Sequence, residues 1–170
     1  MEESIRRRDR SYRENVLSAI SVGAFLILLG VIFVSTPGLI DRVISLSEPD
    51  VFGIVRVPGT DVSLPAPLIL SAHTAVYSAA RMFSLSWGFF LIAFTVTRFV
   101  LKSSLAKKAE TASDVVFWFG AAYLIQVQLL DRAPTYRDWF AFWAALVMVI
   151  GTSLIVRGLL LMIFGVRRRT

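Results

Sequence analysis

Residues 16–35, VLSAISVGAFLILLGVIFVS, decide the fold, because none of their side chains carries a charge. At 1.5 Å per residue, a helix of this length crosses a hydrocarbon core of about 30 Å. Arginines crowd the segment just before it: Arg6, Arg7, Arg8, Arg10 and Arg13. A long uncharged helix behind a basic flank is typical of a signal anchor whose N-terminal side stays in the cytoplasm. The stretch therefore predicts an integral membrane protein.

The composition of the whole chain favours the same class. Of 170 residues, 56% are hydrophobic and 18% are charged, whereas soluble domains carry about 25% charged residues. The formal net charge is +6, but the basic residues gather beside apolar stretches, where they set membrane topology. We therefore expect the lipid bilayer, and no nucleic acid, as a partner. The absence of cysteine excludes disulfides, thiolate nucleophiles and cysteine-based metal sites.

Three further apolar stretches predict three more spans within a single domain, 1–170. The four spans run approximately over 16–35, 78–101, 112–130 and 139–161, with an outer connection at 36–72. The second helix begins either near Pro67 or Ser71, projecting beyond the bilayer, or close to Ser78. Thirteen lysines and arginines fall in or beside the N-terminal arm, the 103–113 connector and the C-terminus, and five fall in the two outer segments. This distribution predicts a multi-pass protein of the cytoplasmic membrane with both termini in the cytoplasm.

The outer connection is predicted to fold into a small cap. Pro37–Ser47 places its apolar residues broadly to one side, as in an amphipathic helix lying on the membrane surface. Val51–Val57 is rich in β-branched residues, and a second short strand is expected over Val62–Leu64, closed by Pro65 and Pro67. The predicted fold class is an all-α membrane protein, a four-transmembrane-helix bundle with an extracytoplasmic helix-plus-hairpin cap.

Small residues at helical spacing predict where the helices pack, because close approach matters between helices in lipid. The predicted packing positions are Gly23 and Gly30 in the first span, Ala80, Ser84 and Gly88 in the second, and Ala144, Gly151 and Gly158 in the fourth. We expect these positions to serve mainly packing within the chain. Contacts with another copy are the alternative.

Five polar residues within the spans are candidate site residues. Arg98, Asp114 and Arg157 fall at a similar depth near the inner interface. Either each reaches the lipid head groups separately, or Asp114 pairs with Arg157 or Arg98 and locks neighbouring helices; an ion or proton site is a third interpretation. Gln126 and Gln128 lie in the outer half of the third span, two residues apart, so they do not share a helix face. They are expected to form interhelical hydrogen bonds or to line a polar path.

The sequence contains no motif of an enzyme, a cofactor site or a metal site. His73 is its one histidine, and it has no H-E-x-x-H, P-loop, G-x-S-x-G or dinucleotide fingerprint. We therefore expect no catalytic residue, no cofactor and no metal, and an enzyme is the less favoured class.

The leading functional interpretation is a non-catalytic small subunit or assembly factor of a membrane complex. It would bind other membrane proteins or a second copy of itself, because a structured outer connection is costly to retain if it binds nothing. The alternative is a small oligomeric transporter or channel. Its polar path would be drawn from Gln126 or Gln128, Tyr123, Asp114 and Arg157.

Two segments carry a resemblance to known proteins. Lys107–Leu124 (KKAETASDVVFWFGAAYL) and Phe142–Leu159 (FWAALVMVIGTSLIVRGL) resemble small multi-span membrane proteins of unknown function from archaea. The resemblance implies an archaeal or bacterial cytoplasmic membrane. It carries over no activity and no functional residue.

Overall fold

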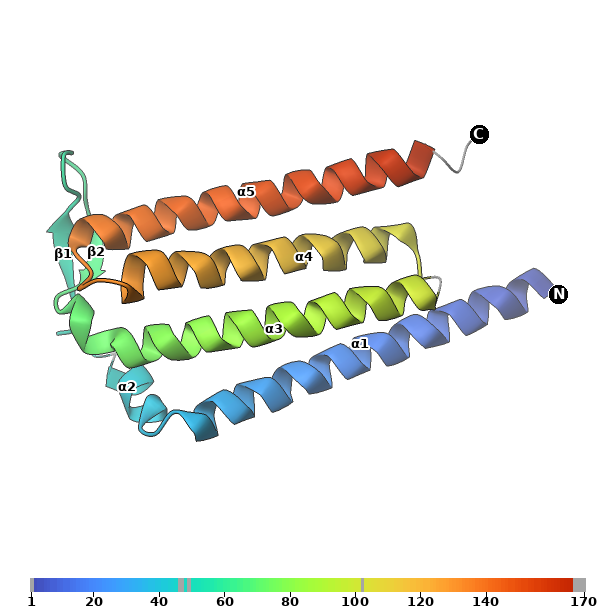
Figure 1. Ribbon diagram of the computed structural model, residues 1–170, viewed down its shortest axis with the longest axis horizontal. Helices are drawn as coiled ribbons and strands as arrows, with labels where there is room; N and C mark the ends of the chain where they lie inside the picture. The colour runs from blue at the N-terminus through green and yellow to red at the C-terminus, as the bar shows by residue number, and fades with distance from the viewer. Residues whose placement is uncertain (1, 46–47, 49, 102, 167–170) are drawn as a thin grey trace.

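The computed structural model describes residues 2–45, 48, 50–101 and 103–166. Four long helices lie side by side in the order α1, α3, α4, α5 (Figure 1). Their bounds are α1 (Glu2–Ser35), α3 (Thr74–Val100), α4 (Leu105–Leu124) and α5 (Tyr136–Val166). Each provides a segment long and apolar enough to cross a membrane: Glu14–Ser35, Leu70–Val100, Leu105–Leu130 and Tyr136–Gly165. The prediction of a mainly helical membrane protein with four candidate spans is confirmed.

The helix boundaries follow local capping signals as well as hydropathy. α3 begins at Thr74, after the 3₁₀ turn η1 (Leu70–His73), and so lies between the two starting points that the sequence left open. α4 begins at Leu105, inside the segment predicted as a connector. Ser104 has an extended backbone, and its hydroxyl accepts a hydrogen bond from the Lys107 amide at 3.4 Å. Serine is a favoured N-cap, and the alanines and lysines that follow favour helix before the apolar stretch begins.

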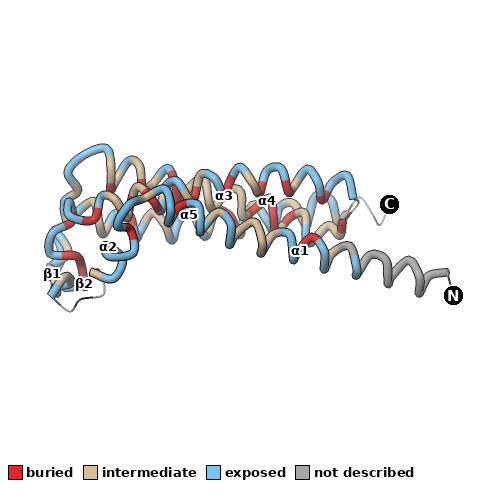
Figure 2. Tube along the Cα trace, turned by 90° about the horizontal axis from the view of Figure 1, so that it is seen from below, coloured by how far each residue is buried: buried red, intermediate tan, exposed pale blue. Residues whose placement is uncertain are grey.

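Most of the tight packing lies between α3, α4 and α5. Phe83 of α3 meets Trp118 of α4 edge to face at 5.6 Å between ring centroids. Nearer the end of the row where α3 begins, a buried cluster is formed by Tyr77, Ile125, Leu129 and Phe142. One third of the most apolar window of α3 and of α4 is buried (33% each), against 11% for α1 and 6% for α5. α3 and α4 are therefore the inner pair, and α1 and α5 are the outer helices of the row (Figure 1). Figure 2 shows how buried and exposed residues alternate along the helices.

α1 is attached to the row mainly through α3. Its Phe25 packs edge to face against Phe83 and Trp87, with ring centroids 5.3 Å apart in both pairs. Ile32 joins Leu39 and Ala79 in a second small buried cluster. The rest of the apolar surface of α1 is largely exposed, with Leu26 and Ile27 at 60% and 70%.

The connection between α1 and α3 forms a small structured unit, which we call the platform: α2 (Leu39–Ser45) and the hairpin of β1 (Phe52–Arg56) and β2 (Ser63–Pro67). The platform lies at the end of the row opposite the N-terminus (Figure 1). A two-stranded hairpin is marginal alone, and here the Tyr136 hydroxyl of α5 donates to the Leu68 carbonyl at 2.9 Å. The predicted hairpin is confirmed.

The second strand differs from its predicted bounds, because β2 continues through Pro65 and Pro67. The reason is the register of the hairpin. The Val57 amide donates to the Val62 carbonyl, and the Leu68 amide donates to the Val51 carbonyl. The backbone N–H and C=O groups of the even-numbered residues of β2 therefore point toward β1. The backbone nitrogens of Pro65 and Pro67 point away from β1, where a missing N–H breaks no ladder bond.

Candidate functional site: a polar pocket between α1, α3 and α4

Charged residues gather where α3 passes into α4. This turn lies at the end of the row that also holds the N-terminus (Figure 1). A pocket of about 210 Å³ opens beside it, between α1, α3 and α4. Its polar lining residues are Ser18, Ser21, Arg98, Lys107, Glu110, Thr111 and Asp114. Two predicted site residues, Arg98 and Asp114, are thus brought to one pocket.

Arg98 is the most buried charged group of the pocket. The residue is only 8% exposed. Its Nη1 donates to the Lys107 carbonyl at 3.0 Å, and its guanidinium lies 4.9 Å from the centre of the Phe94 ring. Its Nε has no hydrogen-bond partner among the described residues. A buried donor left unpaired costs about 1–3 kcal/mol. The Nε–H of Arg98 is therefore available to donate a hydrogen bond to a ligand.

Asp114 lies on the opposite wall, on α4, and is partly exposed. One of the three interpretations was an ion pair with Arg157 or Arg98, and the described residues form no such pair. Among the described residues, no arginine or lysine nitrogen lies within 4.0 Å of its carboxylate, although it interacts electrostatically with Arg157, Arg98 and Lys107. Lys107 instead pairs with Glu110 at 3.0 Å. Depth along the membrane, which the sequence predicts, does not fix the rotation of each helix, and rotation decides which charges touch.

Arg157, the third predicted charge, does not line this pocket. It is exposed on α5 and reaches Asp114 only through its electrostatic field. The sequence interpretation also missed the α1 wall of the pocket. Ser18 and Ser21 are three residues apart, on one face of the mainly apolar first span. That shared face was the available signal for a polar neighbour.

The predicted glutamines lie far from the pocket, in η2 (Ile125–Leu130), a π-helical continuation of α4. Gln126 donates to the carboxylate of Asp131. The Oε1 atoms of Gln126 and Gln128 and the hydroxyl of Tyr77 are buried without a hydrogen-bond partner among the described residues. These atoms make η2 a second region with unpaired buried polar groups. π-Helical turns are frequent at functional sites.

The predicted packing residues divide into two groups. Ser84 and Gly88 are buried on α3, and a Cβ atom added to Gly88 would lie 2.9 Å from the Phe119 ring of α4. Ala80 and Ala144 are exposed. Added Cβ atoms at the remaining positions would meet nothing within 4 Å: Gly23, Gly30, Gly151 and Gly158.

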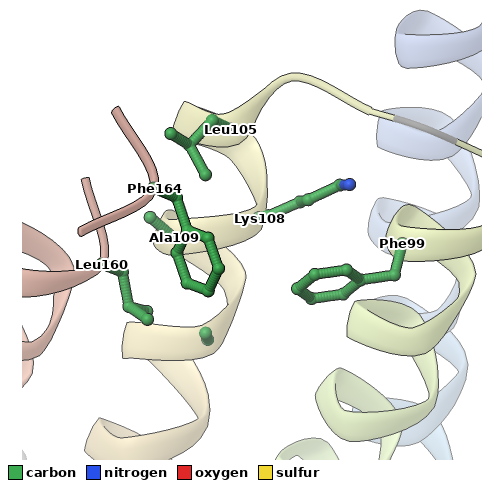
Figure 3. A pocket seen from close by; sticks show the side chains of 7 residues that line it. Phe99, Leu105, Lys108, Ala109, Leu160 and Phe164 are labelled. Atoms are coloured by element: carbon green, nitrogen blue, oxygen red, sulfur yellow. The ribbon is translucent and has the colours of Figure 1, made fainter. Parts of the chain in front are cut away.

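A second pocket, of about 220 Å³, lies between the ends of α3, α4 and α5 (Figure 3). It is mainly apolar, with Phe99, Leu160 and Phe164 around it. The Nζ of Lys108 lies 4.5 Å from the centre of the Phe99 ring. No local pattern indicated this pocket, because one of its walls comes from α5, which is distant in sequence from the α3–α4 turn.

The described residues contain no group of three or more histidine, aspartate or glutamate side chains that could hold a metal ion. No protein-family model, no curated protein and no solved structure matches the chain. The fold and the pocket therefore define the class on their own: a membrane helical protein with four candidate spans and a polar pocket at one end.

Proposed function

We propose that the protein is a multi-pass protein of the cytoplasmic membrane with both termini in the cytoplasm and the platform outside. The placement of the platform and the N-terminus at opposite ends of the helix row supports this topology (Figure 1). The excess of lysine and arginine in the segments on the side of the N-terminus supports it independently.

Within that membrane we propose a non-catalytic role as a small subunit or assembly factor that binds another membrane protein through the platform. One observation carries the proposal: one face of the hairpin carries exposed apolar side chains. Directly paired residues share a face of an antiparallel ribbon, so this face carries Phe52, Ile54, Pro65 and Pro67, and of these four only Pro67 is buried. Ile54 is 82% exposed and Phe52 is 41% exposed.

The exposed faces of α1 and α5 do not carry this argument, because lipid tails cover apolar helices in the membrane. The hairpin lies beyond the four candidate spans, where water would be the default surrounding. Burying an isoleucine side chain is worth about 1.5–3 kcal/mol. A ribbon that keeps such side chains exposed on a fixed support is typical of an interaction surface.

A photo-crosslinking residue tests the proposal. Benzoylphenylalanine placed at Ile54 is expected to crosslink to a distinct membrane protein in native membranes, with a defined mass after extraction. The matched control is Thr60, which is exposed at the tip of the same hairpin and is expected to crosslink weakly. Crosslinks from Ile54 to lipid alone, or equal crosslinking from both positions, would refute a protein partner on this face.

A small oligomeric transporter or channel remains the second candidate, and the unpaired polar atoms favour it. They lie at two depths, with Gln126, Gln128 and Tyr77 in one half and Arg98 in the other. Between these depths the α3–α4 contact is filled by aromatic rings such as Phe83 and Trp118, so a path would run between copies. Ion or proton flux in proteoliposomes that is lost on Gln126→Leu and retained on Val127→Leu would favour this candidate.

A further inference from the structure

We propose that the pocket between α1, α3 and α4 binds the zwitterionic head group of a membrane lipid, one that joins a phosphate to a primary ammonium. This inference does not depend on the proposed partner role, since it concerns the other end of the molecule.

The charges of the pocket balance, which favours a zwitterion over a simple anion. Arg98 and Lys107 are matched by Glu110 and Asp114. Lys107 and Glu110 satisfy each other at 3.0 Å. What remains is one cation and one anion, Arg98 and Asp114, on different helices and without a direct ion pair between them. A zwitterionic ligand can place its anionic group beside Arg98 and its cationic group beside Asp114, so both side chains are neutralised at once.

Arg98 is positioned for the phosphate. Its burial, at 8% exposure, removes most of its contact with water, while its Nε stays unpaired. The bond from Nη1 to the Lys107 carbonyl and the packing against Phe94 hold the guanidinium in place. Arginine N–H groups bind phosphate oxygens through charge-assisted hydrogen bonds, which are about twice as strong as neutral ones.

Asp114 is positioned for the ammonium. Its carboxylate accepts no hydrogen bond from the described residues and is partly exposed in the pocket. A primary ammonium offers three N–H donors to it, whereas a trimethylated one offers none. A purely anionic head group would bring its charge toward Asp114 and Glu110 without compensation.

The remaining lining identifies the ligand as a lipid rather than a free metabolite. Val22, Trp87 and Leu91 form the apolar part of the pocket lining, between α1 and α3. Arg98 lies two residues before the end of α3 at Val100, the depth at which a spanning helix meets the head groups. Acyl chains would therefore follow the α1–α3 contact while the head group fills the polar end.

The test is lipid titration of the purified full-length protein in mild detergent, followed by native mass spectrometry. The probes are short-chain phosphatidylethanolamine, phosphatidylglycerol and phosphatidylcholine, with free phosphoethanolamine as the soluble form of the head group. We expect phosphatidylethanolamine to bind most tightly. Asp114→Asn is expected to weaken it about tenfold, the value of one lost charge-assisted hydrogen bond, without weakening phosphatidylglycerol.

Variants of Arg98 complete the experiment. Arg98→Gln is expected to weaken both lipids, and Arg98→Lys to recover part of the loss because it keeps the charge. The matched control is Lys108→Gln, which changes a cation in the neighbouring apolar pocket and is expected to leave the titration unchanged. Equal binding of phosphatidylethanolamine and phosphatidylcholine, or unchanged selectivity in Asp114→Asn, would overturn the proposal. Free phosphoethanolamine binding as tightly as the lipid would overturn the lipid assignment.

Discussion

Gly88 of α3 faces the ring of Phe119 on α4, and the space beside it does not accept a larger side chain. Phe119 is itself held edge to face against Phe89 at 5.1 Å, so it cannot easily turn away. We expect Gly88→Leu to destabilise the bundle by about 1–3 kcal/mol through overpacking. A thermal melt of the purified protein in detergent would show the loss as a lower midpoint.

The same substitution at Gly151 provides the control, because an added side chain there meets nothing within 4 Å. An unchanged melt for Gly88→Leu, or an equal loss for Gly151→Leu, would contradict the packing described here. Gly88 could be found by its spacing from Ser84 and Ala80. The closer contact of Gly120 with Val149, 2.6 Å from an added Cβ atom, could not be found in this way. A lone small residue becomes a packing position only through the helix placed opposite it.

At the scale of single elements, α5 depends on the capping box at its start. The Thr135 carbonyl accepts the first helical bond, from the Trp139 amide at 3.0 Å. The Asp138 carboxylate accepts from the Thr135 amide at 2.9 Å and from its hydroxyl at 2.7 Å. We expect Asp138→Ala to fray the first turn at a cost of about 1 kcal/mol, seen as faster hydrogen exchange near Trp139.

Arg137→Ala is the control for this prediction, because Arg137 is exposed on the same turn and has no hydrogen bond in the capping box. Equal exchange rates in the two variants would show that the box does not hold the turn. The Leu68 amide, next to the platform, should also exchange faster in Asp138→Ala, since the neighbouring Tyr136 hydroxyl donates to the Leu68 carbonyl.

Hydropathy and charge predicted the helical elements because lipid-spanning helices need long apolar runs, whatever their partners are. The platform hairpin was predictable from its β-branched strand. The extension of β2 through Pro65 was not, because only the register shows that its ring faces outward. The π-helical turn at Gln126 was likewise hidden, since a π-helix differs from an α-helix in hydrogen bonding and not in residue pattern.

For the molecule as a whole, the position of Arg98 and Asp114 toward the same end of the helix row could be predicted by counting along the spans. Their meeting at one pocket could not, because it depends on how α3 and α4 are turned about their axes. The serine face of α1 completes that pocket from a helix far away in sequence. A site assembled from three helices is visible only when all three are placed together.

The proposed topology gives a prediction for the intact molecule. The chain has no cysteine, so single cysteines report cleanly on each side of the membrane. We expect Thr60→Cys, in the platform hairpin, to react with a membrane-impermeant maleimide in intact cells. Ala106→Cys, exposed at the start of α4, should react only after the cells are opened. The reverse labelling pattern would show that the protein has the opposite orientation in the membrane.

The attachment of α1 mainly through α3 has a consequence for biosynthesis. Ribosomes complete α1 before the platform and α3 are made, and the intervening synthesis takes on the order of seconds. In the proposed topology the first helix would enter the bilayer before its main partner exists, and its largely exposed apolar surface would then be covered by lipid. The α1 wall of the pocket can close only after α3 and α4 have both been inserted, which makes completion of that wall a late step in maturation.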